Sequence, residues 1–254
     1  MSAASGSDAR GGRTRPAALQ ALGSLFFTAF LFVWTFGYAI PFVLACLALP
    51  FPRRFPLARG WAATLLWVLK WSCVLDYRVE GAPLPEGSHI AFWKHSSSWE
   101  TLAMMVLFPR QVWVLKRELL WIPVVGIGVQ QMHAIAIDRK SGGTAVAQVI
   151  EQGKERLAEG DWVMIFPEGT RMAVGETRRY GVSGTLLAIE GGRLIVPVAH
   201  NAGHYWPRRG LMKKPGTVRV VIGAPVNPAG REARELNEEI QRWVEATVKA
   251  LEPT

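Results

Sequence analysis

The sequence predicts an α/β domain with a mixed, mostly parallel sheet flanked by helices, preceded by a helical membrane anchor. Three observations support this fold class. After residue 76, short runs of β-branched and aromatic residues alternate with helical patterns, which is typical of α/β proteins. Residues 16–52 contain no charged side chain. Polar clusters follow several predicted strands, and the carboxyl ends of strands are where open α/β sheets place their sites.

Composition narrows the class of partner. The chain has 254 residues, is 50% hydrophobic and carries a formal net charge of +9. A basic chain favours acidic partners such as nucleic acid, anionic lipid headgroups or phosphorylated substrates. The apolar N-terminal region selects lipids from this set, and no nucleic-acid partner is expected. The chain is divided into a disordered tail (1–15), a membrane-anchoring helical segment (16–75) and a catalytic domain (76–254).

The anchor has two interpretations. Residues 22–49 are densely apolar and exceed the roughly 20 residues that span a bilayer, but Pro41 interrupts them. Arginines flank the run on both sides, whereas a simple spanning helix has its positive residues biased to one side. This pattern favours a helical hairpin that enters one leaflet, with both ends on the cytoplasmic face. The alternative is one transmembrane helix over residues 22–49, followed by an amphipathic surface segment over residues 61–75.

The elements of the domain follow from short patterns. Seven strands are predicted at residues 77–79, 89–93, 112–115, 134–137, 162–166, 194–199 and 218–222. Helices are expected at residues 99–108, between the fourth and fifth strands with a stop at Gly160, and at about 231–251. Pro197 lies inside the sixth strand, and proline in a strand indicates an edge or a bulge.

His95 and Glu100 follow the second predicted strand as a His-x4-Glu motif. A histidine can accept a proton near neutral pH, and a neighbouring carboxylate can fix its tautomer and stabilise the imidazolium that forms. Five residues of regular helix rotate a side chain by about 140°, so the two groups meet only if His95 precedes the helix that contains Glu100. We therefore predict a general base and its orienting carboxylate at a strand end.

Two further clusters could bind an anion. Lys116 and Arg117 directly follow the third strand, and paired cations bind phosphate or carboxylate well. The alternative for them is a solvated basic turn. The loop after the fifth strand reads Pro-Glu-Gly-Thr-Arg. Its Arg171 could grip a phosphate with two parallel hydrogen bonds, while Gly169 would let the backbone approach closely.

The ordered motifs resemble those of the lysophosphatidate acyltransferase (1-acyl-sn-glycerol-3-phosphate acyltransferase) family of glycerolipid enzymes. The resemblance covers about residues 89–198, and the order and spacing of the motifs are more specific than any single one. The motifs are His95-x4-Glu100, Lys116-Arg117-x-Leu119-x-Trp121-Ile122-Pro123-x-x-Gly126, Ile137-Asp138-Arg139, Phe166-Pro167-Glu168-Gly169-Thr170-Arg171 and Val196-Pro197-Val198.

The resemblance implies the glycerolipid acyltransferase fold and a reaction in phospholipid biosynthesis. A fatty acyl group would pass from acyl-CoA or acyl carrier protein to the sn-2 hydroxyl of 1-acyl-sn-glycerol 3-phosphate, forming phosphatidic acid. His95 would be the general base and Glu100 its orienter, although the family usually has aspartate at that position. The residues that would bind the acceptor phosphate or build its pocket are Lys116, Arg117, Glu168, Gly169, Thr170 and Arg171.

The expected partners are membrane lipids, lysophosphatidate and the acyl thioester as co-substrate, with no cofactor and no metal. The site would face the cytoplasm, at the inner membrane in a bacterium. Two alternatives stay open: an acyltransferase for another lysolipid, and a non-catalytic membrane lipid-binding protein, which only the aspartate-to-glutamate departure favours. A serine hydrolase is disfavoured, because Thr185 stands where a nucleophile elbow around Ser183 needs glycine.

Overall fold

One seven-stranded sheet forms the centre of the molecule, with strand order β1-β7-β6-β2-β5-β3-β4. The computed structural model describes residues 15–138 and 141–252, so the predicted tail at residues 1–14 and Arg139 lie outside the described residues. Every neighbouring pair of strands is parallel except β6 and β7. The predicted fold class is confirmed.

All seven predicted strands are present, with ends displaced by at most two residues. They are β1 (Leu75–Gly81), β2 (Ile90–Trp93), β3 (Gln111–Lys116), β4 (Ile135–Ile137), β5 (Trp162–Ile165), β6 (Ile195–His200) and β7 (Gly216–Ile222).

The prediction that Pro197 marks an edge strand is wrong. Strand β6 is internal, because it pairs with β2 on one side and with β7 on the other. The Pro197 carbonyl accepts a hydrogen bond of 2.8 Å from Gly223 N, one residue beyond the last β6–β7 pair. Within a strand, the nitrogen and the carbonyl of one residue point to the same side, so the nitrogen of Pro197 also faces β7. The ladder between β6 and β7 ends at this residue, so the strand tolerates the missing N–H there.

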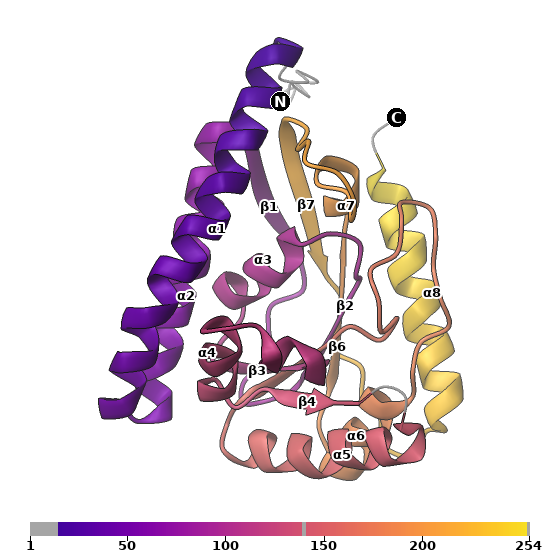
Figure 1. The fold of residues 1–254 in the computed structure, drawn as a ribbon. Coiled ribbons are helices and arrows are strands. Elements are labelled where there is room, and N and C mark those ends of the chain that lie inside the picture. The colour runs from indigo at the N-terminus through magenta and orange to yellow at the C-terminus, as the bar shows by residue number, and fades with distance from the viewer. Residues whose placement is uncertain (1–14, 139–140, 253–254) are drawn as a thin grey trace, which may run out of the picture.

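Helices cover both faces of the sheet. The two N-terminal helices and α3 (Trp99–Leu107) pack on one face, and α5 (Gly143–Ala158), α6 (Ser183–Gly191) and α8 (Ala233–Leu251) pack on the other (Figure 1). Strand β2 supplies both cores: Ala91 and Trp93 face the first layer, and Ile90 and Phe92 face the second. This alternation is the period of two expected for a strand buried on both sides.

Short elements complete the domain near the N-terminal helices. They are the 3-10 helix η1 (Arg117–Trp121), α4 (Val125–Gln131) and α7 (Ala202–Tyr205). The predicted stop of α5 is confirmed, because the helix ends at Ala158 and Gly160 adopts a left-handed conformation with φ +84°. Glycine adopts that conformation without steric cost.

The anchor segment is a hairpin of two long helices, α1 (Ala17–Ala48) and α2 (Phe51–Cys73), which lie side by side along the domain (Figure 1). The chain turns at Leu49–Pro50, and Pro41 lies inside α1 rather than at a break. Proline removes only one helical hydrogen bond, and Phe42 and Cys46 are buried against neighbouring residues. Packing therefore carries the helix through Pro41.

Because the chain turns at Leu49–Pro50 and not at Pro41, the arginines that flank the apolar run lie elsewhere than the sequence indicated. The side chain of Arg54 donates to the carbonyls of Leu49 and Gln131, at 2.9 and 3.1 Å, so it lies at the tip of the hairpin. Arg15 donates to the Ser72 carbonyl at the open end. The arginines at the two ends of the apolar run thus lie at opposite ends of the hairpin, because α1 is straight and does not fold back at Pro41.

Helix α1 is long and apolar enough to cross a membrane, judged by length and composition. It also packs on the domain at both ends. Near its start, the Ser24 hydroxyl accepts a 3.0 Å hydrogen bond from Lys213 N; near its end, Phe42 lies against Gly128 of α4. Its outward face exposes a row of large apolar side chains: Leu19, Leu22, Leu25, Phe26, Phe32, Val33, Phe36, Ile40, Leu44 and Leu47.

Candidate active site

The carboxylate of Glu100 joins the loop after β2 to the first turn of α3. Its Oε1 accepts three hydrogen bonds, from His95 Nδ1 at 2.9 Å, Ser96 N at 2.9 Å and Ser97 N at 2.8 Å. His95 precedes the helix and Glu100 lies inside it, which is the arrangement that the spacing predicts. Because Nδ1–H donates to Glu100, His95 Nε2 is left unprotonated and available as a base.

Glu100 is fully buried, with an exposed fraction of 0%. Burial by itself raises the pKa of Glu100, but the hydrogen bond from His95, the nearby His200 and the Ser97 N–H together hold this pKa below its ordinary value. The carboxylate is therefore ionised at neutral pH. An ionised Glu100 stabilises the imidazolium that forms when His95 accepts a proton.

The loop after β5 holds His95 from the other side. The His95 ring stacks on Phe166, with ring centroids 3.9 Å apart. The His95 N–H donates to Glu168 Oε2 at 3.0 Å, and the His95 carbonyl accepts from Met172 N at 2.8 Å. Both the ring and the peptide groups of His95 are thus fixed before substrate arrives, which is the preorganisation that acid–base catalysis needs.

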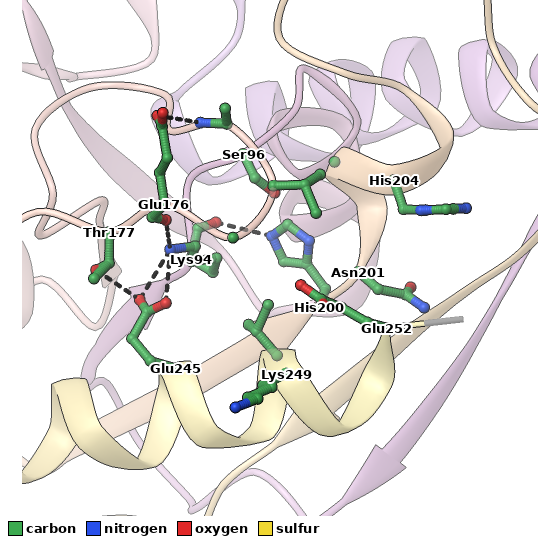
Figure 2. A pocket seen from close by; sticks show the side chains of 15 residues that line it. Lys94, Ser96, Glu176, Thr177, His200, Asn201, His204, Glu245, Lys249 and Glu252 are labelled. Atoms are coloured by element: carbon green, nitrogen blue, oxygen red, sulfur yellow. Dashed lines mark hydrogen bonds and ion pairs between the residues drawn. The ribbon is translucent and has the colours of Figure 1, made fainter. Parts of the chain in front are cut away.

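A buried lysine organises this loop. Lys94 is 2% exposed, and its ammonium contacts Glu168 Oε1 at 2.8 Å. It also contacts Glu245 Oε1 at 2.9 Å and the Glu176 carbonyl at 3.0 Å (Figure 2). Burial raises the pKa of Glu168 even though Lys94 opposes that shift. Both oxygens of Glu168 are engaged, by Lys94 and by the His95 N–H, so this side chain holds the loop that contains His95.

A cavity of about 480 Å³ lies between the hairpin and the sheet. Its walls are mainly apolar and come from α1, α2, α3, α4 and β3, including Tyr38, Phe42, Trp61, Met104, Trp113 and Met132. The polar residues His95, Lys116, Thr170 and Arg171 also line it, and we call this set its polar end. A long hydrocarbon chain fits such walls, and the predicted base and two cations line the same cavity.

The remaining predicted residues lie around this polar end. Gly169 has φ +70°, so the tight turn there favours glycine. Arg171 is exposed and donates to Ser98 Oγ at 2.7 Å. Lys116 pairs with Glu118 at 2.8 Å. Arg117 does not line the cavity and pairs with Asp138 at 3.2 Å. Phosphate binding by these residues stays a prediction.

Sequence reasoning missed two buried residues next to the site, Lys94 and His200. His200 is fully buried on β6, and its Nε2 lies 2.8 Å from the Lys94 carbonyl. The position of Lys94 directly before His95 is the one signal that pointed to it. In the part of the chain that the structure describes, no group of three His, Cys, Asp or Glu side chains is placed to hold a metal.

Comparison with known proteins agrees with this geometry. A family model described as Acyltransferase matches residues 76–201. The 1-acyl-sn-glycerol-3-phosphate acyltransferase of Pseudomonas aeruginosa is 38% identical over 234 residues, which cover 90% of each chain. The alpha form of that enzyme from Mus musculus is 30% identical over 149 residues, covering 58% of this chain and 52% of the mouse protein.

A solved structure shares the fold. The crystal structure of the 1-acyl-sn-glycerophosphate acyltransferase from Thermotoga maritima superposes with a TM-score of 0.74, at 21% identity, over 91% of this chain and 95% of the other. The match therefore includes the helical hairpin as well as the sheet. Together with the sequence matches, it shows that this chain belongs to the 1-acyl-sn-glycerol-3-phosphate acyltransferase family.

Proposed function

We propose that this protein transfers a fatty acyl group from a thioester to the sn-2 hydroxyl of 1-acyl-sn-glycerol 3-phosphate, forming phosphatidic acid. The observation that supports this most is the cavity in which His95 meets both an apolar volume and two cations, Lys116 and Arg171. A lysophosphatidate has the same two parts, one hydrocarbon chain and one phosphomonoester, with its free hydroxyl between them.

The mechanism uses His95 first as a base and then as an acid. His95 Nε2 takes the proton of the acceptor hydroxyl while the oxygen attacks the thioester carbonyl carbon. Glu100, 2.9 Å from Nδ1, stabilises the resulting imidazolium. The tetrahedral intermediate then expels the thiolate as its C–S bond breaks, and the imidazolium returns the proton to sulfur. The products are an ester and a free thiol.

The acceptor phosphate is assigned to the polar end of the cavity. Arg171 presents a planar guanidinium for paired hydrogen bonds, and Lys116 adds a point charge. Both side chains are exposed. Arg171 is bonded to Ser98 and Lys116 to Glu118, and an incoming phosphate would displace these two partners. Thr170 belongs to the same polar end. Arg117, the residue after Lys116, would add positive potential near the phosphate without lining the cavity.

Membrane attachment follows from the hairpin. Ser24 and Phe42 both contact the domain, and the helix between them is about 27 Å long, close to the thickness of the hydrocarbon core. A helix that is held against the domain at both ends of that length lies along the membrane rather than across it. We therefore place the apolar face of α1 in one leaflet, on the cytoplasmic side, so that lipid substrates enter the cavity between hairpin and sheet.

The acyl donor is a thioester of coenzyme A or of acyl carrier protein, both of which are acidic and suit a chain of net charge +9. The test supplies purified protein in anionic vesicles with either donor, and compares lysophosphatidate with glycerol 3-phosphate as acceptor. Phosphatidic acid should form only from lysophosphatidate. Acylation of glycerol 3-phosphate alone, or hydrolysis of the thioester without an acylated lipid, would refute the assignment.

Arg171→Ala tests the phosphate site. Because Arg171 is predicted to bind the ground state and the transition state alike, the KM for lysophosphatidate should rise, on the order of tenfold or more, with kcat changed much less. Arg178→Ala is the matched control, since Arg178 is an exposed arginine in the same connecting segment that does not line the cavity. An unchanged acceptor dependence in Arg171→Ala would remove this residue from the phosphate site.

A further inference from the structure

One oxygen of Glu100 has no hydrogen-bond partner. Oε1 accepts all three hydrogen bonds to the carboxylate, whereas Oε2 is buried and unpartnered. An ionised oxygen in that position needs a compensating dipole or charge, because burial without one is costly. A polar side chain on β6 lies 4.0 Å from this oxygen and makes no hydrogen bond to Glu100.

That group is His200, whose Nε2 lies 4.0 Å from Glu100 Oε2. Its tautomer is fixed by its neighbours. Nδ1 accepts a hydrogen bond from Ala202 N at 3.2 Å, so the ring proton is on Nε2, which donates to the Lys94 carbonyl at 2.8 Å. The positive end of the Nε2–H dipole therefore lies beside the unpartnered oxygen, and the same N–H holds the residue that precedes His95.

We propose that His200 is a positioning residue of the acyl-transfer site, which through its Nε2–H fixes the Lys94 carbonyl and stabilises the second oxygen of Glu100. This inference rests on the proposed function. His200 does not touch substrate; it acts through Glu100 and Lys94 on the orientation and proton affinity of His95.

His200 suits this role because it is neutral. Burial lowers the pKa of His200, and the charges of His95 and Lys94 lower it further, against the opposing effects of Glu100 and of the hydrogen bond to the Lys94 carbonyl. The ring centroids of Trp93 and Trp99 each lie 6.1 Å from that of the imidazole. A charged His200 would repel the imidazolium that forms at His95, whereas a neutral N–H supplies a dipole without that penalty.

Other charged groups near the pair are already engaged with one another. The Lys94 ammonium is bound by Glu168, and by Glu245 and the Glu176 carbonyl (Figure 2). Figure 2 also shows the imidazole of His200 facing the Lys94 carbonyl, with Glu245 and Lys249 of α8 on the far side of the cavity that these residues line. The groups whose titration the test must separate are thus His95, Glu100, Lys94 and His200.

Two substitutions distinguish the roles of the two ring nitrogens of His200. Asparagine places its amide near the position of Nδ1, so His200→Asn keeps the contact with Ala202 and loses the donor at Nε2. Glutamine reaches the position of Nε2, so His200→Gln keeps the donor to Lys94. His204→Asn is the matched control, since His204 is a half-buried histidine of α7 for which no contact with Glu100 or Lys94 exists in the described structure.

In His200→Asn, kcat for acyl transfer should fall on the order of tenfold, with the KM for acceptor unchanged. Removing the positive end of a dipole makes the His95–Glu100 pair hold its proton more tightly, so the acidic limb of the kcat/KM profile should move to higher pH. His200→Gln should restore both values toward wild type, and His204→Asn should change neither. If the acidic limb of the kcat/KM profile of a folded His200→Asn protein is unchanged, the inference is overturned. It is also overturned if His200→Gln fails to restore kcat and the position of this limb.

A measurement on the wild-type protein covers the case in which His200→Asn does not fold. In protein with 15N-labelled histidine, the His200 Nε2–H resonance should show the neutral tautomer from pH 5.5 to 8 and should move as His95 titrates. A resonance that ignores His95, or a charged His200, would overturn the inference. This readout needs no substrate, so it is distinguishable from failure of the proposed function, which would appear as wild-type protein that acylates no lysophosphatidate.

Discussion

Replacing Glu100 by glutamine tests the electrostatic role of this side chain without changing its size. In the reaction, His95 becomes an imidazolium whose Nδ1 is 2.9 Å from Glu100 Oε1. With an effective dielectric of about 20, two unit charges at that distance attract by roughly 6 kcal/mol. This value is an upper limit for the transition-state stabilisation that glutamine forfeits, because the charge transfer is incomplete and the amide oxygen still accepts a hydrogen bond.

A loss of about 4 kcal/mol corresponds to a decrease in kcat on the order of a thousandfold. The assay is transfer of a labelled acyl group from thioester to lysophosphatidate in vesicles, at saturating acceptor, with melting temperatures measured for each protein. Asp161→Asn is the matched control. Asp161 is another fully buried carboxylate, paired with Arg110. It lies just before β5, whereas His95 lies just after the neighbouring parallel strand β2, so the two residues are at opposite ends of these strands.

The two substitutions should separate catalysis from stability. Asp161→Asn should lower the melting temperature, because it weakens a pair with Arg110, while the kcat of the folded protein stays near wild type. Glu100→Gln should lower kcat far more than any loss of folded protein explains. A Glu100→Gln protein that stays folded and retains kcat within tenfold of wild type would refute the electrostatic account of this pair.

Two further predictions concern the cavity and the response to acid. Gly128 lines the cavity against Phe42, and a Cβ added there would lie 3.6 Å from that ring, so Gly128→Ala should be tolerated. Gly128→Leu should instead lower kcat/KM for long acyl chains relative to short ones by roughly thirtyfold, since excluding two to three methylenes costs about 2 kcal/mol; equal loss for all chain lengths would contradict it. Burial lowers the pKa of His200 from 6.5, so below pH 6.5 the unfolded chain gains a proton that the folded protein does not. Stability should then fall by about 1.4 kcal/mol per pH unit from this residue, and urea unfolding at pH 7.5 and 5.5 should show a smaller loss in His200→Gln than in wild type.

The sequence predicted those parts of the structure that depend on local pattern. Short runs of three to six residues placed all seven strands, and the five-residue offset between His95 and Glu100 correctly placed one residue before the helix and the other inside it. Both are short-range features, in which periodicity and helix geometry leave little choice.

Features that depend on residues distant in sequence could not be found in this way. Lys94 binds Glu245 of α8, and His200 of β6 lies 4.0 Å from Glu100 of α3. These partners can be identified only once the order of the strands is known. Pro41 illustrates the opposite error: proline is a strong local signal for a break, yet burial of Phe42 and Cys46 against neighbouring elements outweighs it. The edge assignment of Pro197 also failed because it depended on long-range pairing. The β6–β7 ladder ends at Pro197, so an inner strand tolerates a residue without an N–H there.

The most direct test of the account is the activity of His95→Ala. Equal amounts of wild-type protein and this variant would be placed in anionic vesicles with lysophosphatidate and an acyl thioester, and phosphatidic acid would be measured over time. Because His95 is the only base that lines the polar end of the cavity in the described part of the chain, its removal should lower the rate on the order of a thousandfold while the protein stays folded and vesicle-bound. Phosphatidic acid formed at the wild-type rate would contradict the central claim.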